Sequence, residues 1–219
     1  RRRPNYPDAH WNPALTRVLG GNYKKGWEKY EWRSKKEKNA SKPHALPKCI
    51  LWSGETATNQ INQLLLVTEQ GLGDTLQFMR YALALRDQGV DVSLCAQPKL
   101  HSLIKTSGID PSPLTPQQAN QVTDGQWIPL LSVPRHLEVS PENPIVTESY
   151  IKTTEELHTK WAGILTAEQR PIIGINWQGN PSQEKLEANG RSLPLEVFAA
   201  FATNTNASLL SLQKGFGSE

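Results

Sequence analysis

The chain reads LLLVTEQGLGDTLQFMRY from Leu64 to Tyr81. The apolar run that opens this stretch has the length of a buried parallel strand, and the two glycines after it predict a tight turn. Asp74 then lies where the pattern predicts the start of a helix. A carboxylate there accepts hydrogen bonds from free backbone N–H groups and interacts favourably with the helix dipole. The stretch therefore predicts a strand, a turn and a helix of an α/β fold.

The carboxylate of Asp74 has two interpretations. Open α/β sheets bind ligands in the crevice at the carboxyl ends of their strands. An ionised, oriented carboxylate in that crevice is a candidate general base. The alternative is a purely structural N-cap of the helix. The motif alone favours neither interpretation, and both stay open here.

The alternation of strands and helices continues beyond this stretch. A second α/β unit begins near Pro171. It consists of only one strand-helix-strand set, which leaves its sheet without neighbours on the exposed edges. We therefore expect a first Rossmann-like domain over 61–168, the start of a second over 169–219, and a natural protein that continues. The predicted strands are 64–68, 90–95, 126–131, 172–177 and 208–212, and the predicted helices after the turn are 74–87, 98–106, 153–165 and 194–203.

The amino-terminal residues 1–33 predict two short helices broken at Gly20-Gly21-Asn22, with Asp8 and Asn22 as N-caps. The order of small and aromatic residues is typical of a tetratricopeptide repeat, in which two antiparallel helices pack closely. A single repeat does not bury its own apolar face. We expect this helical pair to cap the following domain or to end an array. Residues 34–60 are polar and contain prolines, which indicates a connector.

Charge is distributed unevenly along the chain. Residues 1–48 carry 13 Lys or Arg against 4 Asp or Glu, whereas the remaining 171 residues carry 11 against 17. No nucleic-acid-binding motif accompanies the basic end. We interpret it as a solvated helix face that continues into the connector, and we expect no nucleic-acid partner.

Other composition signals exclude several classes of protein. No apolar run approaches the roughly 20 residues that span a bilayer. No apolar segment follows Arg1-Arg2-Arg3, so this start is not a signal peptide and we expect a cytoplasmic protein. Cys49 and Cys95 are far apart, which indicates two buried thiols rather than a disulfide framework or a zinc site.

The glycine turn does not fit the common cofactor motifs. Leu76 stands where a dinucleotide-binding motif has its third glycine, and no acidic residue follows Cys95 at the end of the second strand. No Lys-Ser or Lys-Thr pair completes a P-loop. The five histidines, at 10, 44, 101, 136 and 158, lack metal-ligand spacing. The sequence therefore predicts neither a cofactor nor a metal.

Three motifs, taken in their order along the chain, carry a resemblance to a known family. They read EQGLGDTLQF over 69–78, WQGNP over 177–181, and RSLPL over 191–195 closing on SLQKG over 211–215. Together they resemble bacterial tetratricopeptide-repeat proteins with a glycosyltransferase family nine, heptosyltransferase-like, domain. The helical pair, which ends GWEKYEWR over 26–33, is similar to the last repeat of those proteins.

This resemblance implies a GT-B architecture, in which two Rossmann-like halves face a cleft. The first half binds a hydroxyl acceptor on a glycan, lipid or protein, and the second binds a nucleotide-sugar donor. By motif position, Asp74 is the base that deprotonates the acceptor, within a loop that includes Gln70, Gly71 and Gly73. The donor phosphates are assigned to Gly179, Asn180 and Arg191.

Less specific interpretations remain beside these assignments. The Gly179-Asn180 segment is also compatible with a simple turn, and Arg191 with a surface ion pair. A protein of this kind that has lost catalysis would be a scaffold, which binds protein partners through its helical repeat. Binding of nucleotide sugars distinguishes the transferase from the scaffold. The enzyme prediction applies to the complete protein, because the resemblance stops within the donor half.

Overall fold

The computed structural model describes residues 6–36, 40–56, 60–145, 148–184, 192–203, 206–215 and 217–218. The chain divides into two compact units, Arg1–Thr154 and Glu155–Glu219. The boundary expected from the sequence lies after residue 168, whereas the structure divides the chain after Thr154. The helix over 155–165 therefore belongs to the second unit. The helical pair lies in the same unit as the first sheet.

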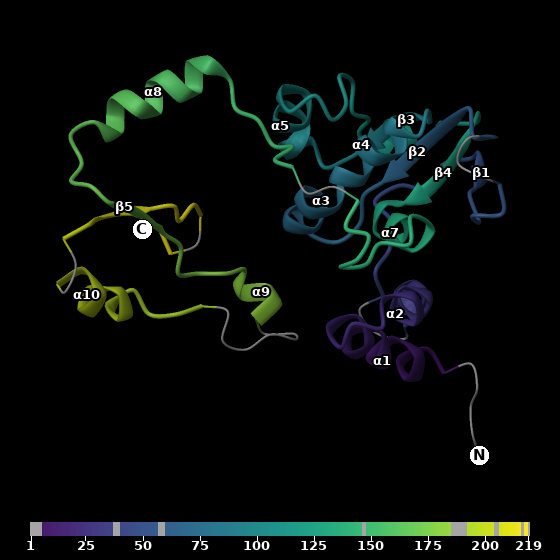
Figure 1. The fold of residues 1–219 in the computed structure, drawn as a ribbon, viewed down its shortest axis with the longest axis horizontal. Coiled ribbons are helices and arrows are strands. Elements are labelled where there is room, and N and C mark those ends of the chain that lie inside the picture. The colour runs from purple at the N-terminus through teal and green to yellow at the C-terminus, as the bar shows by residue number, and fades with distance from the viewer. Residues whose placement is uncertain are drawn as a thin grey trace. The chain divides into compact units, whose positions relative to one another are not determined.

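A parallel sheet of four strands forms the centre of the first unit (Figure 1). The strands are β1 (Ile50–Leu51), β2 (Gln63–Val67), β3 (Asp91–Cys95) and β4 (Gln126–Pro129), and their order is β1-β4-β2-β3. All three pairings are parallel. The α/β class predicted from the sequence is confirmed.

Strand β2 is buried on both faces because its side chains alternate between them. Leu64 and Leu66 pack into one apolar cluster. Leu65 and Val67 pack into a second cluster with Trp127 of β4. A parallel strand covered on both sides has no polar face, which explains the unbroken apolar run in the sequence.

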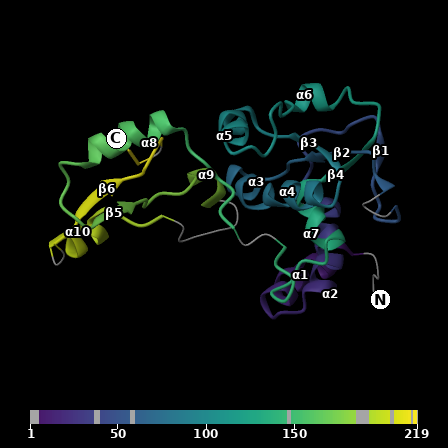
Figure 2. The ribbon, with the colours of Figure 1, turned by 45° about the horizontal axis from the view of Figure 1, so that its top comes forward.

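Short helices cover the two faces of this sheet. Helix α4 (Arg80–Asp87) contributes Leu85 to the first cluster, whereas α6 (Pro116–Ala119) contributes Ala119 to the second, and Figure 2 shows these helices on opposite sides of the strands. The single helix predicted over 74–87 is in fact two, α3 (Leu72–Phe78) and α4, which meet at the buried Met79. The described residues of this part also contain η3 (Pro98–Leu100), α5 (His101–Thr106), η4 (Leu130–Ser132) and α7 (Val133–His136).

The amino-terminal pair consists of α1 (Pro7–Leu19) and α2 (Tyr23–Tyr30), followed by η1 (Glu31–Lys35). Gly26 permits the close packing that the sequence predicts, because a Cβ there would lie 2.6 Å from Cγ2 of Val18. The indole N–H of Trp27 donates to the carbonyl of Val139 at 2.9 Å, which ties α2 to the segment after α7.

Two predictions about helix starts are corrected by this part of the structure. Asp8 is not an N-cap, because α1 begins at Pro7 and Tyr6 precedes it. Asp8 lies in the first turn, where its charge still favours the helix dipole. Asn22 does occupy the N-cap position of α2, but its side chain makes no capping hydrogen bond.

The connector after η1 is ordered where the structure describes it. Pro43 forms an antiparallel bridge with Glu69, and the backbone N–H of His44 donates to the carbonyl of Thr68 at 2.8 Å. Ala45 is buried against the second face of the sheet. This segment therefore lies along the sheet and covers part of it.

The second unit contains the predicted strand-helix-strand set. Its elements are α8 (Glu155–Leu165), β5 (Ile172–Ile175), α9 (Pro181–Glu184), α10 (Glu196–Thr203) and β6 (Ser208–Ser211). Strands β5 and β6 are parallel, with Ile172 opposite Ser208. Helices α8 and α10 have no buried residue among those described, so this unit has little core of its own.

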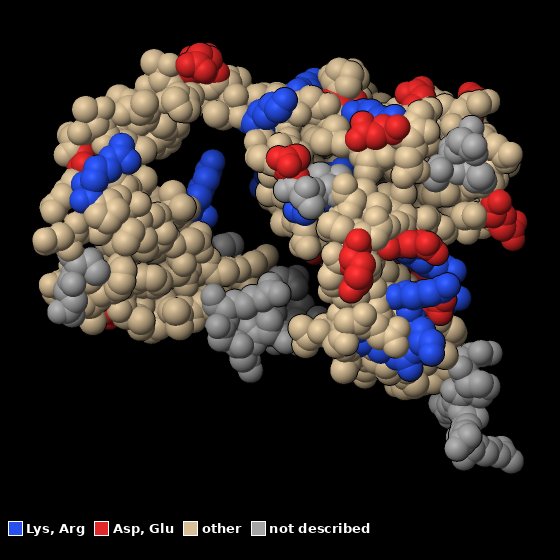
Figure 3. Space-filling view, viewed as in Figure 1, with Lys and Arg blue, Asp and Glu red and all other residues tan. Residues whose placement is uncertain are grey.

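Several composition-based predictions can be compared with the described residues. Among them, no helix combines the length and the apolar character required to cross a bilayer. Cys49 and Cys95 are buried free thiols, as predicted, and burial raises the pKa of Cys95 to about 12. Lys and Arg side chains gather over the helical pair (Figure 3), where Lys36 lies 5.1 Å from the ring centroid of Trp11.

The turn after β2 is built differently from the sequence-based prediction. Neither glycine has a positive φ, and Gly71 is an extended N-cap with φ −85°. An added Cβ at Gly73 would meet no atom within 4 Å. The left-handed residue is Gln70, with φ 63°. The sequence predicts that side chains at both glycines would clash; a Cβ at Gly71 would lie 3.3 Å from Oδ2 of Asp74, a tight contact, so the prediction fails at Gly73 only.

This conformation makes position 70 sensitive to the type of side chain. We expect Gln70→Val to lower the free energy of unfolding by roughly 1–2 kcal/mol, because a β-branched residue is strained in the left-handed region. Gln70→Gly, the matched control, is expected to stay within about 0.5 kcal/mol of the wild type. Urea unfolding measures both, and equal stability of the two variants would contradict the assigned turn.

Candidate functional site

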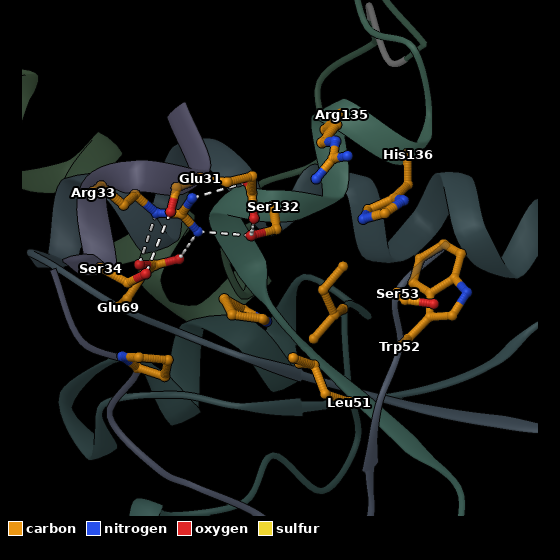
Figure 4. A pocket seen from close by; sticks show the side chains of 13 residues that line it. Glu31, Arg33, Ser34, Leu51, Trp52, Ser53, Glu69, Ser132, Arg135 and His136 are labelled. Carbon is orange, nitrogen blue, oxygen red and sulfur yellow. Dashed lines mark hydrogen bonds and ion pairs between the residues drawn. The ribbon is translucent and has the colours of Figure 1, made fainter. Parts of the chain in front are cut away.

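The candidate site lies where the carboxyl ends of β2 and β4 meet the end of the helical pair. Arg33 of η1 extends to this edge and is only 3% exposed. Its Nε donates to Oε2 of Glu69 at 3.0 Å, and its Nη2 donates to Oε1 of Glu69 at 2.6 Å. Figure 4 shows this bidentate ion pair among its neighbours. Glu69 itself is 1% exposed, so both charges are buried.

Every N–H of the Arg33 guanidinium has an acceptor. Besides the two bonds to Glu69, Nη2 donates to Oγ of Ser132 at 2.7 Å. Nη1 donates to Oε1 of Glu31 at 3.0 Å and to the carbonyl of Tyr30 at 3.3 Å. An arginine side chain has five N–H donors, and here each of them has an acceptor from a neighbouring residue. The buried cation is therefore completely satisfied.

The carboxylates around Arg33 are also satisfied. Oε2 of Glu69 accepts a further hydrogen bond from Oγ of Ser41 at 2.8 Å, and Oε2 of Glu31 accepts one from Oγ of Ser132 at 2.9 Å. Burial alone lowers the pKa of Arg33, but the hydrogen bonds and charge of Glu69 outweigh burial, so the pKa is raised. Arg33 therefore remains protonated at physiological pH.

Asp74 lies five residues after Glu69 along the chain. It occupies the third position of α3, and its Oδ2 accepts a hydrogen bond from the backbone N–H of Gly71 at 3.0 Å. The N-cap is Gly71, so Asp74 caps the helix from inside its first turn. The carboxylate is half-buried. Burial raises the pKa of the nearby Tyr30 hydroxyl, and the negative charges of Glu69 and Asp74 act in the same direction.

The rest of the predicted acceptor-side loop is close to Asp74 in the chain and is exposed. The side-chain amide of Gln70 donates to Oγ of Ser41 at 3.2 Å, which links the loop to Glu69. Gly71 and Gly73 are both exposed. The hydroxyl of Thr75, which is buried, donates to Oε1 of Gln97 at 2.9 Å and ties α3 to the end of β3.

The predicted donor-side residues lie in the second unit. The backbone N–H of Gly179 donates to Oγ of Ser192 at 3.0 Å, and that hydroxyl donates to Oε2 of Glu184 at 2.9 Å. The carbonyl of Asn180 accepts from the backbone N–H of Glu184 at 3.2 Å. Gly179 and Asn180 thus form the turn between β5 and α9. Arg191 lies outside the described residues.

Sequence reasoning missed Arg33 and Glu69 as a pair. Both residues stand inside the motifs quoted for the resemblance, but 36 positions separate them. Ser132, which completes the cluster, is a further 63 residues along the chain from Glu69. An arginine at the end of the helical pair and a glutamate directly after the buried strand are the only sequence signals of this contact.

The part of the chain that the structure describes contains no set of side chains that could bind a metal ion. No group of three or more His, Cys, Asp or Glu side chains lies close enough together there to hold an ion.

Comparisons with family models, with curated proteins and with solved structures found no match to this chain.

The buried cluster yields a direct stability prediction. Ser132→Ala leaves one N–H of Arg33 and one oxygen of Glu31 without their partner, so we expect the free energy of unfolding to fall by about 1–3 kcal/mol. Ser102→Ala, at an exposed position of α5, is the control and is expected to change it by less than about 0.5 kcal/mol. Chemical denaturation tests this, and equal effects would show that the cluster contributes little.

Proposed function

We propose that the protein transfers a sugar from a nucleotide-sugar donor to a hydroxyl group of an acceptor, with Asp74 as the general base. The observation that supports this most is the position of the Asp74 carboxylate. It follows the carboxyl end of a central strand in a parallel sheet, where open α/β folds bind ligands. It is half-buried, and its Oδ2 accepts a hydrogen bond from the backbone N–H of Gly71.

In the proposed reaction, Asp74 accepts the proton of the acceptor hydroxyl as the hydroxyl oxygen attacks the anomeric carbon of the sugar. The bond from that carbon to the diphosphate oxygen breaks, and the nucleoside diphosphate leaves with the electron pair. This single displacement inverts the configuration at the anomeric carbon. A positioned base contributes about 10²- to 10⁴-fold to such a rate.

We assign the donor diphosphate to the turn after β5, through Gly179 and Asn180, together with Arg191. A guanidinium is suited to the phosphate oxygens because it donates two parallel hydrogen bonds. The N–H of Gly179 already has Oγ of Ser192 as its acceptor. A phosphate oxygen bound by that N–H would therefore replace the Ser192 hydroxyl.

The proposal includes a tetratricopeptide-type helical pair and two Rossmann-like halves. The close approach of Gly26 to Val18 supports a tetratricopeptide-type helical pair. The parallel strands of each unit support two Rossmann-like halves of a GT-B enzyme, with the acceptor on the first and the donor on the second. On this basis we propose the glycosyltransferase family nine type of enzyme for the protein.

Asp74→Asn separates the catalytic role of this residue from its structural role. The asparagine oxygen still accepts the hydrogen bond from Gly71, so we expect the free energy of unfolding to change by less than about 1 kcal/mol. Sugar transfer is expected to fall by about 10²- to 10⁴-fold, because asparagine takes up no proton. Asp91→Asn, at the exposed start of β3, is the matched control and is expected to leave turnover unchanged.

The assay needs a donor, so thermal stability is first measured against a panel of nucleotide sugars and free nucleotides. Stabilisation by one nucleotide class selects the donor for the turnover measurement. Full turnover in Asp74→Asn would remove Asp74 from the mechanism. If no nucleotide or nucleotide sugar stabilises the folded protein and it binds protein partners instead, the protein is a scaffold and the proposal is contradicted.

A further inference from the structure

A cavity of about 300 Å³ lies at the carboxyl ends of β1 and β4, beneath η1 and α7 (Figure 4). Neither Asp74 nor the loop from Gln70 to Gly73 lines it. It is therefore separate from the proposed catalytic loop, although the cluster of Arg33, Glu69, Glu31 and Ser132 forms one of its walls. Its volume is at the lower end of the range for small-molecule pockets, which is roughly 300–1,000 Å³.

One wall of this cavity is formed by the buried cluster, in which one guanidinium is paired with two carboxylates, so its formal charge is −1. Arg33 balances Glu69 in the bidentate pair, and Glu31 is the second carboxylate on the same guanidinium. Glu31 has one oxygen on Arg33 and the other on Ser132. The hydrogen-bonding capacity of this wall is thus largely used within the protein. It therefore offers a ligand few free hydrogen-bonding groups.

The opposite wall carries Arg135, a cation that is available to bind an anion. Arg135 of α7 is exposed, and Figure 4 shows its guanidinium directed toward the space between Ser132 and Leu51. Of the carboxylates that the structure describes, none lies within ion-pair distance of it, since both described ion pairs belong to Arg33. A guanidinium with free donors at the edge of a cavity binds oxyanions well, because two of its N–H groups match two oxygens.

An aromatic pair lies beside Arg135. The rings of Trp52 and His136 are 4.6 Å apart between centroids and tilted by 34°. Gly54 allows this arrangement, because a Cβ at that position would lie 2.2 Å from Nδ1 of His136. Burial lowers the pKa of His136, and the charge of Arg135 lowers it further. His136 is therefore neutral at neutral pH, and it presents a flat ring rather than a second charge.

We propose that this cavity binds a small molecule of about monosaccharide size through a phosphate or carboxylate group. Arg135 holds the anionic group, the hydroxyl of Ser53 lines the cavity as a further polar contact, and the ring pair of Trp52 and His136 contacts the carbon skeleton. This site requires no glycosyl transfer, so it stands independently of the proposed reaction.

Isothermal titration calorimetry of the whole chain tests the site with three probes that share one carbon skeleton. Glucose 6-phosphate carries a phosphate, glucuronate carries a carboxylate, and glucose carries no charge. We expect one or both anions to bind and glucose not to bind. The better of the two anions identifies the preferred group.

Arg135→Gln is expected to weaken binding of that anion at least about tenfold, because it removes a charge-assisted hydrogen bond. Arg17→Gln removes the same charge from α1 and is expected to leave binding unchanged. Asp74→Asn is also expected to leave it unchanged, which separates this site from the proposed catalytic one. Absence of binding of both anions up to about 10 mM, equal binding of glucose, or full affinity in Arg135→Gln would overturn the proposal.

Discussion

The ion pair between Arg33 and Glu69 is the contact on which the arrangement of the first unit depends. Both side chains are almost fully buried, and burial of charges costs several kcal/mol per ion unless geometry and hydrogen bonding compensate. Here the two parallel hydrogen bonds of the guanidinium and its three further acceptors provide that compensation. The stability of the buried pair therefore depends on the hydrogen bonds of the whole cluster.

This cluster connects the helical pair to the loop that carries the proposed base. Arg33 follows α2 directly, and Glu69 precedes the left-handed Gln70 and the start of α3. Because Ser41 bonds both Glu69 and Gln70, the connector takes part as well. A shift of the helical pair would break hydrogen bonds at the loop, so the position of Asp74 is coupled to a structure outside the sheet.

The sequence predicts those elements whose pattern is local. The apolar run of β2 and the segment before Cys95 were recognised because buried parallel strands are unbroken and apolar. Strand β1 was missed because it has two residues, and α6 was missed because its four residues lie in a segment rich in proline and glutamine. The break at Met79 has no turn residue to mark it.

The site was predictable in its position along the chain but not in its contacts. The start of a helix after a buried strand was enough to select Asp74. The glycine argument held for the crowded Gly71 and failed for Gly73, and the left-handed φ belongs to Gln70, a residue type that rarely adopts it. Arg33 and Ser132 come from elements on either side of the strand in sequence, and only the tertiary fold brings them to Glu69.

A double-mutant cycle on Arg33 and Glu69 tests the central claim most directly. Urea unfolding is measured for the wild type, Arg33→Met, Glu69→Gln and the double variant. Each single change leaves a buried polar group without its partner, so we predict a loss of about 3–5 kcal/mol for each. The double variant is predicted to lose less than the sum, with a coupling energy of at least about 2 kcal/mol. Additive losses would show that the two residues contribute separately and would contradict the account.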